Sequence, residues 1–492
     1  MSQNIERDST DGPQLFGQPR GLATLFMTEM WERFTYYGMR AILILFMAGA
    51  ISEGGLALDD KTAGAVYGLY IAATYLLAPM GGWIADRLIG QQRSVVWGGV
   101  LIMLGNGLLA AGDTRMFFIG LIVIVLGVGL LKPNISALVA QLYPEGGSRR
   151  DAGFSIFYMG INLGAVLGSF FVPITAAAFG WSAGFALPAL GMLLGLVQFQ
   201  VTKSHLGTSG LVPLGKPATW WPIVGFMVIV VIVAGLGVSG ALSFNPVQIS
   251  IVANWTMIAL AAGYFAYLAF FAGLDLTERK RVVAMIALFA ACAMFWAGFE
   301  QTGASLNLFA DRHTDRVIFG WEMPAGVLQG VNPAFIIIFA PVIAAIWVML
   351  GKRNLDPSAP FKFSLGLILM GVGFFVMYLA AQYVVQGEKV LPTWLMLTYL
   401  FHTFGELCLS PVGLSSMTKL APARFVGQVM GLWFLATAVG NNLAGQFSGE
   451  FDPNNLPGMP DRFLYLMWWG VLAGAVLLVL TPFIKKMMGG VK

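Results

Sequence analysis

The chain has 492 residues, of which 58% are hydrophobic and only 11% charged, a balance that excludes an ordinary soluble domain. The net charge of +4 at pH 7 lies in short loops and does not indicate a nucleic-acid partner. Two cysteines, Cys292 and Cys408, and three scattered histidines offer neither a disulfide framework nor a metal site, so we expect no cofactor.

Apolar stretches long enough to cross a bilayer recur along the whole chain. They predict an all-α polytopic membrane protein with fourteen spanning helices. The expected spans are residues 22–50, 62–88, 94–112, 116–142, 151–176, 181–203, 219–240, 249–273, 282–308, 325–350, 362–386, 392–420, 425–447 and 461–488.

Lys and Arg residues are about three times as frequent in the loops on the side of the two termini as in the opposite loops. The positive-inside rule therefore predicts a multi-pass protein of the cytoplasmic (inner) membrane. Both termini would lie in the cytoplasm.

Residues 1–20 are polar and rich in Asp, Gln, Pro and Gly, and we expect them to form a disordered cytoplasmic tail. The first span follows and carries Glu29, Glu32, Arg33 and Arg40. On a helix the first three share one face, so Glu29 can pair with Arg33. Because unpaired charges at membrane depth are costly, this face should line a polar interior and have partners elsewhere in the chain.

The loop after the second span contains Gly82, Asp86, Arg87, Gly90 and Arg93, in an order that resembles the loop signature of the major facilitator superfamily. An aspartate beside arginines forms an ion-pair lock that can break and form again, so Asp86 and Arg87 are candidate gating residues. A generic basic loop is the alternative interpretation.

The fourth span contains a single charge, Lys132, and Pro133 beside it leaves a backbone carbonyl without its helical donor. A lysine at this depth needs a carboxylate or a water-filled cavity. It belongs either to a functional site or to a static buried ion pair.

The fifth span carries Gly160, Gly164 and Gly168 at four-residue spacing, which predicts a face for close packing against a neighbouring helix. Asn162 lies in the same span. Its amide must be satisfied, either as a link between helices or as a ligand contact.

The two spans at 219–240 and 249–273 contain no charged residue, so we expect them to face lipid and to be functionally quiet. They would be a pair inserted between two six-helix halves, as in transporters built from repeats. The expected organisation is a first bundle at 21–203, a linker and inserted pair at 204–281, and a second bundle at 282–492.

The second half adds Glu300, Asn332 and Glu406 at membrane depth, and the aromatic pair Trp433 and Phe434. Over both halves the buried carboxylates then outnumber the buried cations by one. A proton-binding site needs such an excess, because binding one proton neutralises the cluster.

Three ordered motifs resemble the proton-dependent oligopeptide transporter (POT, or peptide transporter) family of the major facilitator superfamily, in its prokaryotic branch. They are Glu29-Met-Trp-Glu-Arg-Phe34, Leu131-Lys-Pro-Asn134 and Phe157-Tyr-Met-Gly-Ile-Asn-Leu-Gly164. The resemblance implies two six-helix bundles with two extra helices. It also implies a symporter that imports di- and tripeptides by alternating access, driven by the inward proton gradient.

The same resemblance implies roles for individual residues. Substrate-binding residues would be Arg33, Tyr36, Tyr37, Arg40, Tyr75, Lys132, Asn162, Asn332, Glu406, Trp433 and Phe434. Within that set, the peptide carboxylate would be held by Arg33, Tyr37 and Lys132, and its amino group by Asn162, Asn332 and Glu406. Proton coupling would involve Glu29, Glu32, Arg33 and Glu300. The gates would be formed by Arg40, Glu300, Lys132, Glu406, Asp86 and Arg87.

One position departs from the family pattern, because mammalian-like members have a histidine in the second span where this chain has Gly68. Proton coupling would therefore rest on carboxylates.

Other functions remain open at this point. A family member that carries nitrate or another small solute needs cations without matching carboxylates, and Glu406 argues against it. A drug/proton antiporter would also suit apolar walls and buried glutamates. A transporter-like receptor or an enzyme fits the buried charges poorly. We expect a monomer that lies in the lipid bilayer, with peptides as substrates and protons as coupling ions.

Overall fold

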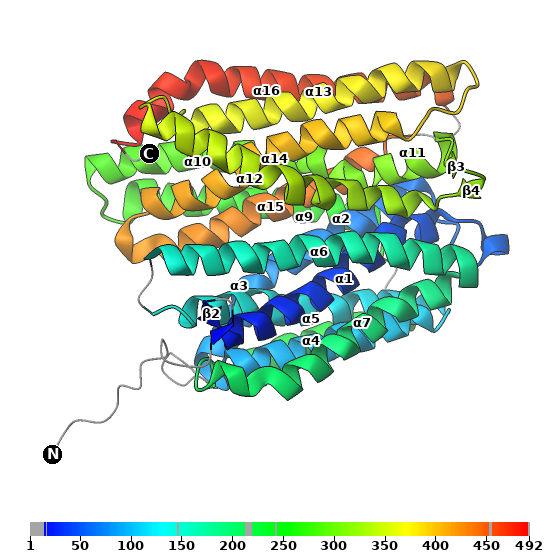
Figure 1. Cartoon of the computed structure of the whole chain (residues 1–492), viewed down its shortest axis with the longest axis horizontal. Helices are drawn as coiled ribbons and strands as arrows, with labels where there is room; N and C mark the ends of the chain where they lie inside the picture. The colour runs from blue at the N-terminus through cyan, green and yellow to red at the C-terminus, as the bar shows by residue number, and fades with distance from the viewer. Residues whose placement is uncertain are drawn as a thin grey trace. The chain divides into compact units, whose positions relative to one another are not determined.

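The computed structural model describes residues 14–15, 17–144, 147–211, 219–241, 244–451 and 455–490. This part of the chain is built almost entirely from long helices, which are numbered in chain order and most of which Figure 1 labels. The expected all-α polytopic fold is confirmed. Eleven described helical segments are long and apolar enough to cross a membrane, so the protein is a multi-pass membrane protein.

The chain divides into two compact units, each formed from two separate parts of the sequence. Unit 1 runs to Ile42 and resumes at Leu76–Phe244, and unit 2 comprises Leu43–Tyr75 and everything from Asn245 onward. The last eight residues of the first predicted span (43–50) and nearly all of α2 therefore belong with the C-terminal helices. The bundle boundaries expected from the sequence differ from these limits and stay a prediction.

Unit 1 contains the greater part of α1 (Arg20–Ala48), together with five long helices, one short helix and a small hairpin. Its further elements are β1 (Gln14–Leu15), β2 (Gln18–Pro19), α3 (Ala78–Ile84), the π-helical turn Ala85–Ile89, α4 (Gln91–Ala110), α5 (Thr114–Gln141), α6 (Gly147–Phe179), α7 (Trp181–Thr202), the 3₁₀ turn Lys203–Leu206 and α8 (Trp221–Val238).

Unit 2 contains the end of α1, the 3₁₀ turn Ile51–Glu53, and α2 (Asp60–Leu76) except for its last residue. Its further helices are α9 (Pro246–Ala266), α10 (Leu276–Phe299), α11 (Ser305–His313), α12 (Val331–Lys352), α13 (Ala359–Val385), α14 (Thr393–Leu420), α15 (Val426–Ser448) and α16 (Met459–Met487). The remaining elements are β3 (Val317–Ile318), β4 (Trp321–Glu322), the π-helical turn Tyr267–Phe271, and the 3₁₀ turns Glu300–Gly303, Ala325–Gly330, Ala423–Phe425 and Leu456–Gly458.

Each predicted span coincides with a helical segment whose ends differ from the prediction by a few residues, but two of the spans are broken. The second is interrupted at Leu77, where α3 begins with Pro79 in its first turn. A proline is tolerated there because the first helical N–H groups have no partner within the helix. The ninth is interrupted by the 3₁₀ turn Glu300–Gly303 between α10 and α11.

The start of the chain differs from the tail that we expected at residues 1–20. Residues 1–13 lie outside the described part. Gln14–Leu15 and Gln18–Pro19 pair as an antiparallel hairpin, and the Tyr143 hydroxyl donates a hydrogen bond to Gln18 Oε1 at 2.8 Å. The helix α1 begins directly afterwards.

In unit 1, α6 packs against α1 through the glycines that the sequence predicted to form a packing face. A Cβ at Gly160 would lie 2.8 Å from the Phe26 ring, and a Cβ at Gly164 would lie 2.9 Å from Cβ of Arg33. A Cβ at Gly168 would overlap the Phe34 carbonyl. The prediction is confirmed, and the two helices approach more closely than any larger residue permits.

In unit 2, α2 crosses α15 at a second pair of glycines. A Cβ at Gly68 would lie 3.0 Å from the Asn442 carbonyl oxygen and 3.1 Å from Cα of Gly445. Gly68 is the position where the resemblance described above implies a histidine in mammalian-like members. A side chain of that size does not fit between these two backbones unless the helices separate.

The inserted helix α9 does not face lipid on all sides, contrary to our expectation for the inserted pair; its functional quietness stays a prediction. Ser250 and Asn254 are buried, and the Ser250 hydroxyl donates to Asn442 Oδ1 at 2.9 Å. Asn442 Nδ2 donates in return to the Ser250 carbonyl at 2.7 Å, and Gln446 Nε2 donates to Ser250 Oγ at 3.0 Å. Hydropathy missed these contacts because small polar residues hardly lower the mean of an apolar span. In contrast, α8 is exposed over most of its length, as predicted.

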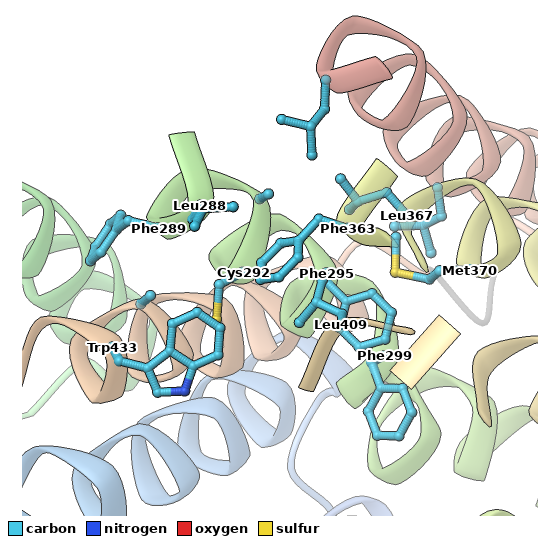
Figure 2. Close-up of a cluster of buried hydrophobic side chains, with 14 of the residues drawn as sticks. Leu288, Phe289, Cys292, Phe295, Phe299, Phe363, Leu367, Met370, Leu409 and Trp433 are labelled. Carbon is cyan, nitrogen blue, oxygen red and sulfur yellow. The ribbon is translucent and has the colours of Figure 1, made fainter. Parts of the chain in front are cut away.

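The core of unit 2 is a large cluster of apolar side chains from α10, α13, α14, α15 and α16. Figure 2 shows Trp433 of α15 in this cluster with Cys292 and Phe363. The Trp433 and Phe363 rings lie edge to face, with centroids 6.2 Å apart. This packing holds the helices that carry Glu300 and Glu406.

Candidate functional site

The first charged cluster lies on α1, where one guanidinium meets two carboxylates. Arg33 Nε is 2.8 Å from Glu29 Oε1 and 2.8 Å from Glu32 Oε2. The pairing of Glu29 with Arg33 that the helical spacing predicted is confirmed. Glu29 is 2% exposed, Glu32 is 0% exposed and Arg33 is 4% exposed, so neither carboxylate is screened by bulk water. The group carries a net charge of −1 when both glutamates are ionised.

The packing of α6 against α1 fixes the position of this charged cluster. Because Gly164 has no side chain, the backbone of α6 lies against Met30 and against Cβ of Arg33. On the other side, the Thr35 hydroxyl donates to the Pro188 carbonyl of α7 at 2.9 Å. These two contacts hold the turn of α1 that carries Arg33.

Lys132 of α5 is half-buried, and its charge acts on Glu32. The segment around it is held by Asn134, whose Nδ2 donates to the Leu130 carbonyl at 2.7 Å and to the Gly81 carbonyl of α3 at 3.1 Å. Asn134 thus connects α5 to α3 two residues away from the lysine. The sequence predicted the motif but not this cross-link.

Two arginine–tyrosine contacts extend the charged face of α1. The guanidinium carbon of Arg33 lies 5.6 Å from the centre of the Tyr36 ring, and that of Arg40 lies 5.7 Å from the centre of Tyr37. The two tyrosine rings meet edge to face at 5.2 Å. An aromatic ring attracts a cation through its negative face, so these contacts stabilise both guanidinium groups inside the protein.

Asn162, on α6, is 4% exposed and donates from Nδ2 to the Tyr158 carbonyl of its own helix at 3.0 Å. The sequence left open whether Asn162 links two helices or contacts a ligand. This hydrogen bond lies within one helix, so it is not the link between helices. The assignment of Asn162 to a ligand contact stays a prediction.

The second polar cluster lies in unit 2, between α12 and α14. Asn332 Nδ2 donates to Thr403 Oγ1 at 3.0 Å and to Glu406 Oε2 at 3.2 Å. The structure therefore brings together Asn332 and Glu406, which are far apart in sequence and which we expected to share one role. Thr403 was not predicted. Its position three residues before Glu406, on the same helical face, is the signal that could have identified it.

Glu300 lies at the break between α10 and α11 and is 4% exposed. Gln301 stabilises this break, because its Nε2 donates to the Ala444 carbonyl of α15 at 2.9 Å. The Ser305 hydroxyl donates to Gln301 Oε1 at 2.6 Å. Non-helical backbone is tolerated at membrane depth only where its polar groups are satisfied by the protein or by a water-filled cavity. The predicted glutamate therefore occupies an irregular segment.

The aromatic residues Tyr75, Trp433 and Phe434, which the resemblance implies as substrate-binding residues lining side-chain pockets, have different surroundings. Trp433 is 6% exposed and belongs to the core of unit 2, where its ring also fills the space beside Gly413. Phe434 is partly buried against the same cluster. Tyr75 is partly buried beside a smaller apolar group that includes Met257 of α9. Their role as substrate-pocket residues stays a prediction.

Asp86 and Arg87 occupy the π-helical turn after α3. Asp86 accepts a hydrogen bond from Gln91 Nε2 at 2.9 Å. The segment that follows α7 is attached to the start of α4 beside this turn, because Gln92 donates from its backbone N–H to the Gly210 carbonyl at 3.0 Å. Its side-chain Nε2 donates to the Ser209 carbonyl at 2.7 Å.

The predicted site residues are thus divided between the two units. Unit 1 holds the cluster on α1, Lys132 and Asn162, whereas unit 2 holds Glu300, Asn332 and Glu406 with their aromatic neighbours. The expected gates that pair residues of different units therefore stay predictions.

Several known proteins are similar to this chain over nearly its whole length. The chain is 40% identical to a protein named peptide transporter YePEPT from Yersinia enterocolitica, over 97% of this chain and 96% of that protein. It is 35% identical to a di-/tripeptide transporter from Lactococcus lactis, over 97% and 98% of the two chains. A crystal structure of a peptide transporter POT in complex with sulfate superposes with a TM-score of 0.90 at 41% identity, and covers 98% of this chain and 99% of its own.

A POT family transporter in complex with 5-aminolevulinic acid superposes with a TM-score of 0.89 at 36% identity, over 97% of this chain and all of that one. The family model itself matches residues 92–455. These relatives are transporters and not enzymes, and they share the whole length of the fold. The chain therefore belongs to the POT family of membrane transporters.

Proposed function

We propose that the protein is a proton-coupled symporter that imports di- and tripeptides across the cytoplasmic membrane by alternating access. Relatives that span the same length carry the names peptide transporter and di-/tripeptide transporter, which supports the substrate class. The observation that carries the coupling is the buried cluster of Glu29, Glu32 and Arg33, in which one cation is shared by two carboxylates.

The shared cation gives a simple coupling rule. With both glutamates ionised, Arg33 is fully engaged and the group is negative. A proton on one glutamate removes one of the two attractions that hold the guanidinium. Arg33 can then bind the carboxylate of a peptide, and the combined charge of the group and that carboxylate remains −1. Binding of the proton and binding of the peptide therefore favour each other, as linkage between two sites requires.

The two ends of a zwitterionic peptide match the two clusters in charge. The cations of unit 1, Arg33 and Lys132, suit its carboxylate. Asn332 and Glu406 of unit 2 suit its ammonium group. The relative bound to 5-aminolevulinic acid supports the same logic, since that compound also carries an amine at one end and a carboxylate at the other.

Gating completes the proposal. Arg40 with Glu300 would form one gate, Lys132 with Glu406 a second, and Asp86 with Arg87 a lock at the ends of the helices. We further propose a monomer with both termini in the cytoplasm, coupled to protons and without a cofactor.

The test is uptake of a labelled dipeptide by proteoliposomes that contain the purified protein, with and without an inward proton gradient. We expect accumulation that depends on the gradient and is competed by unlabelled di- and tripeptides. Glu32→Gln should abolish accumulation against a gradient yet retain counterflow, the exchange of labelled for unlabelled peptide without net proton movement. Full accumulation by this variant would exclude Glu32 from coupling, and robust uptake of nitrate or export of a cationic drug would replace the substrate class.

A further inference from the structure

Thr403 is a fully buried residue of α14 that has no role in the proposal so far. Its hydroxyl makes two hydrogen bonds. It donates to the Tyr399 carbonyl of its own helix at 2.7 Å and accepts from Asn332 Nδ2 of α12 at 3.0 Å. The threonine therefore connects the two helices that carry the polar cluster of unit 2.

Counting donors and acceptors determines how the Asn332 amide is oriented. A hydroxyl has one proton, and that of Thr403 is given to a carbonyl that can only accept. Thr403 can therefore only accept from Asn332. Glu406 Oε2 lies 3.2 Å from Asn332 Nδ2, and a carboxylate in the ionised form that an ammonium group requires can also only accept. Both neighbours thus require the NH₂ group of the amide.

This orientation decides what Asn332 presents to a ligand. With its NH₂ group turned to Thr403 and Glu406, the amide turns its carbonyl oxygen Oδ1 in the opposite direction. A carbonyl oxygen and a carboxylate together attract a group that donates hydrogen bonds and carries a positive charge. The reversed amide would present N–H groups instead and would repel an ammonium ion.

We propose that Thr403 is a positioning residue that fixes the Asn332 amide, and thereby sets the preference of this cluster for a substrate ammonium group. The inference rests on the proposed function, in which Asn332 and Glu406 hold the amino end of the peptide. Without the hydroxyl, one N–H of Asn332 loses its acceptor inside the protein. The amide is then held only by its longer bond to Glu406.

The test compares variants of two buried threonines on α14. Thr403→Val removes the hydroxyl and keeps the shape, Thr403→Ser restores the hydroxyl, and Thr403→Ala is a second variant without it. The matched control is Thr398→Val, because Thr398 is equally buried and its hydroxyl lies within hydrogen-bonding distance of the Trp394 and Gly373 carbonyl oxygens, at 3.0 and 3.1 Å, either of which can take its one proton. Each protein is purified, checked for a single elution peak and reconstituted in proteoliposomes.

The readout is competition against uptake of a labelled dipeptide by dialanine and by N-propionylalanine, which lacks only the ammonium group. For Thr403→Val and Thr403→Ala we expect the affinity for dialanine to fall about 3- to 10-fold, the range of one lost hydrogen bond. The affinity for N-propionylalanine should stay within about twofold of the wild type, well below that range. The ratio of the two affinities should return to the wild-type value in Thr403→Ser and should not change in Thr398→Val.

Three results would overturn the inference. These are an unchanged ratio in both variants without the hydroxyl, an equal loss for both competitors, which indicates general damage, or the same loss of ratio in Thr398→Val. Failure of the proposed function is recognised separately, because wild-type protein would then take up no dipeptide at all, and the inference would fall with it.

Discussion

From the contact between Gly164 and α1 we predict that a larger residue at this position lowers both the thermal stability of the protein and its gradient-driven uptake. Gly164→Ala adds one methyl group where the backbone of α6 meets α1. That carbon would lie 2.9 Å from Cβ of Arg33 and would overlap the Met30 carbonyl oxygen. Since neither neighbour is the flexible end of a side chain, the helices themselves must move.

The expected magnitude follows from this geometry. Two carbon atoms are at their best separation at about 3.5 to 4.0 Å, so α6 must withdraw by roughly 0.6 to 1 Å. Overpacking of this kind costs about 1 to 3 kcal/mol. At about 2.1 cal/mol/K of unfolding entropy per residue over 492 residues, this cost should lower the melting temperature by roughly 1 to 3 °C. The same withdrawal shifts Arg33 from its two carboxylates, so gradient-driven uptake should fall as well.

The control is Gly107→Ala in the last turn of α4, where an added Cβ meets nothing within 4 Å. In that variant the higher helix propensity of alanine acts without a steric cost, and we expect an unchanged or slightly higher melting temperature. Thermal unfolding of both purified variants in detergent, followed by tryptophan fluorescence, measures the difference. If Gly164→Ala melts together with Gly107→Ala and transports normally, the close approach of α6 to α1 does not position Arg33.

Two further predictions concern unit 2. Asp60→Asn should lower the melting temperature, because Asp60 is 8% exposed and accepts two hydrogen bonds from the Arg312 guanidinium, at 2.6 and 2.8 Å. The control is Glu450→Gln, which breaks an ion pair with Arg462 that is exposed on both sides. That variant should have no measurable effect on the melting temperature. Equal melting temperatures would show that the buried pair adds nothing. Ser250→Ala should destabilise the protein by about 1 to 3 kcal/mol, because Asn442 Oδ1 then loses its donor in a buried position. Wild-type thermal stability in that variant would contradict the inferred attachment of α9 to α15.

Much of the fold could be predicted because the relevant physics is local. A bilayer requires long apolar stretches, and the loops between them carry the charge bias, so the spans follow from composition alone. The pairing of Glu29 with Arg33 also follows from local spacing, since residues four apart on a helix are neighbours. The glycines of α6 predicted a close contact for a similar reason.

What could not be predicted depends on residues that meet across long stretches of chain. Nothing in the sequence near Ser250 identifies Asn442 as its partner, and Thr403 resembles any other threonine until Asn332 lies beside it. The break at Glu300 was also missed, because the surrounding span is apolar enough to read as one continuous helix. A hydropathy value is an average over many residues, so it does not reveal the pairs of polar residues that determine how two helices pack.

The attachment of α9 to α15 has a consequence for how the protein is made. Ser250 and Asn442 are separated by 192 residues, so α9 enters the membrane long before its partner has been synthesised. At roughly 5 to 20 residues per second this delay is about 10 to 40 s. During that time Ser250 and Asn254 must be satisfied by another helix, by water or by the insertion machinery. A chain that terminates before α15 lacks Asn442, so Ser250 keeps none of the side-chain partners that bury it in the finished protein.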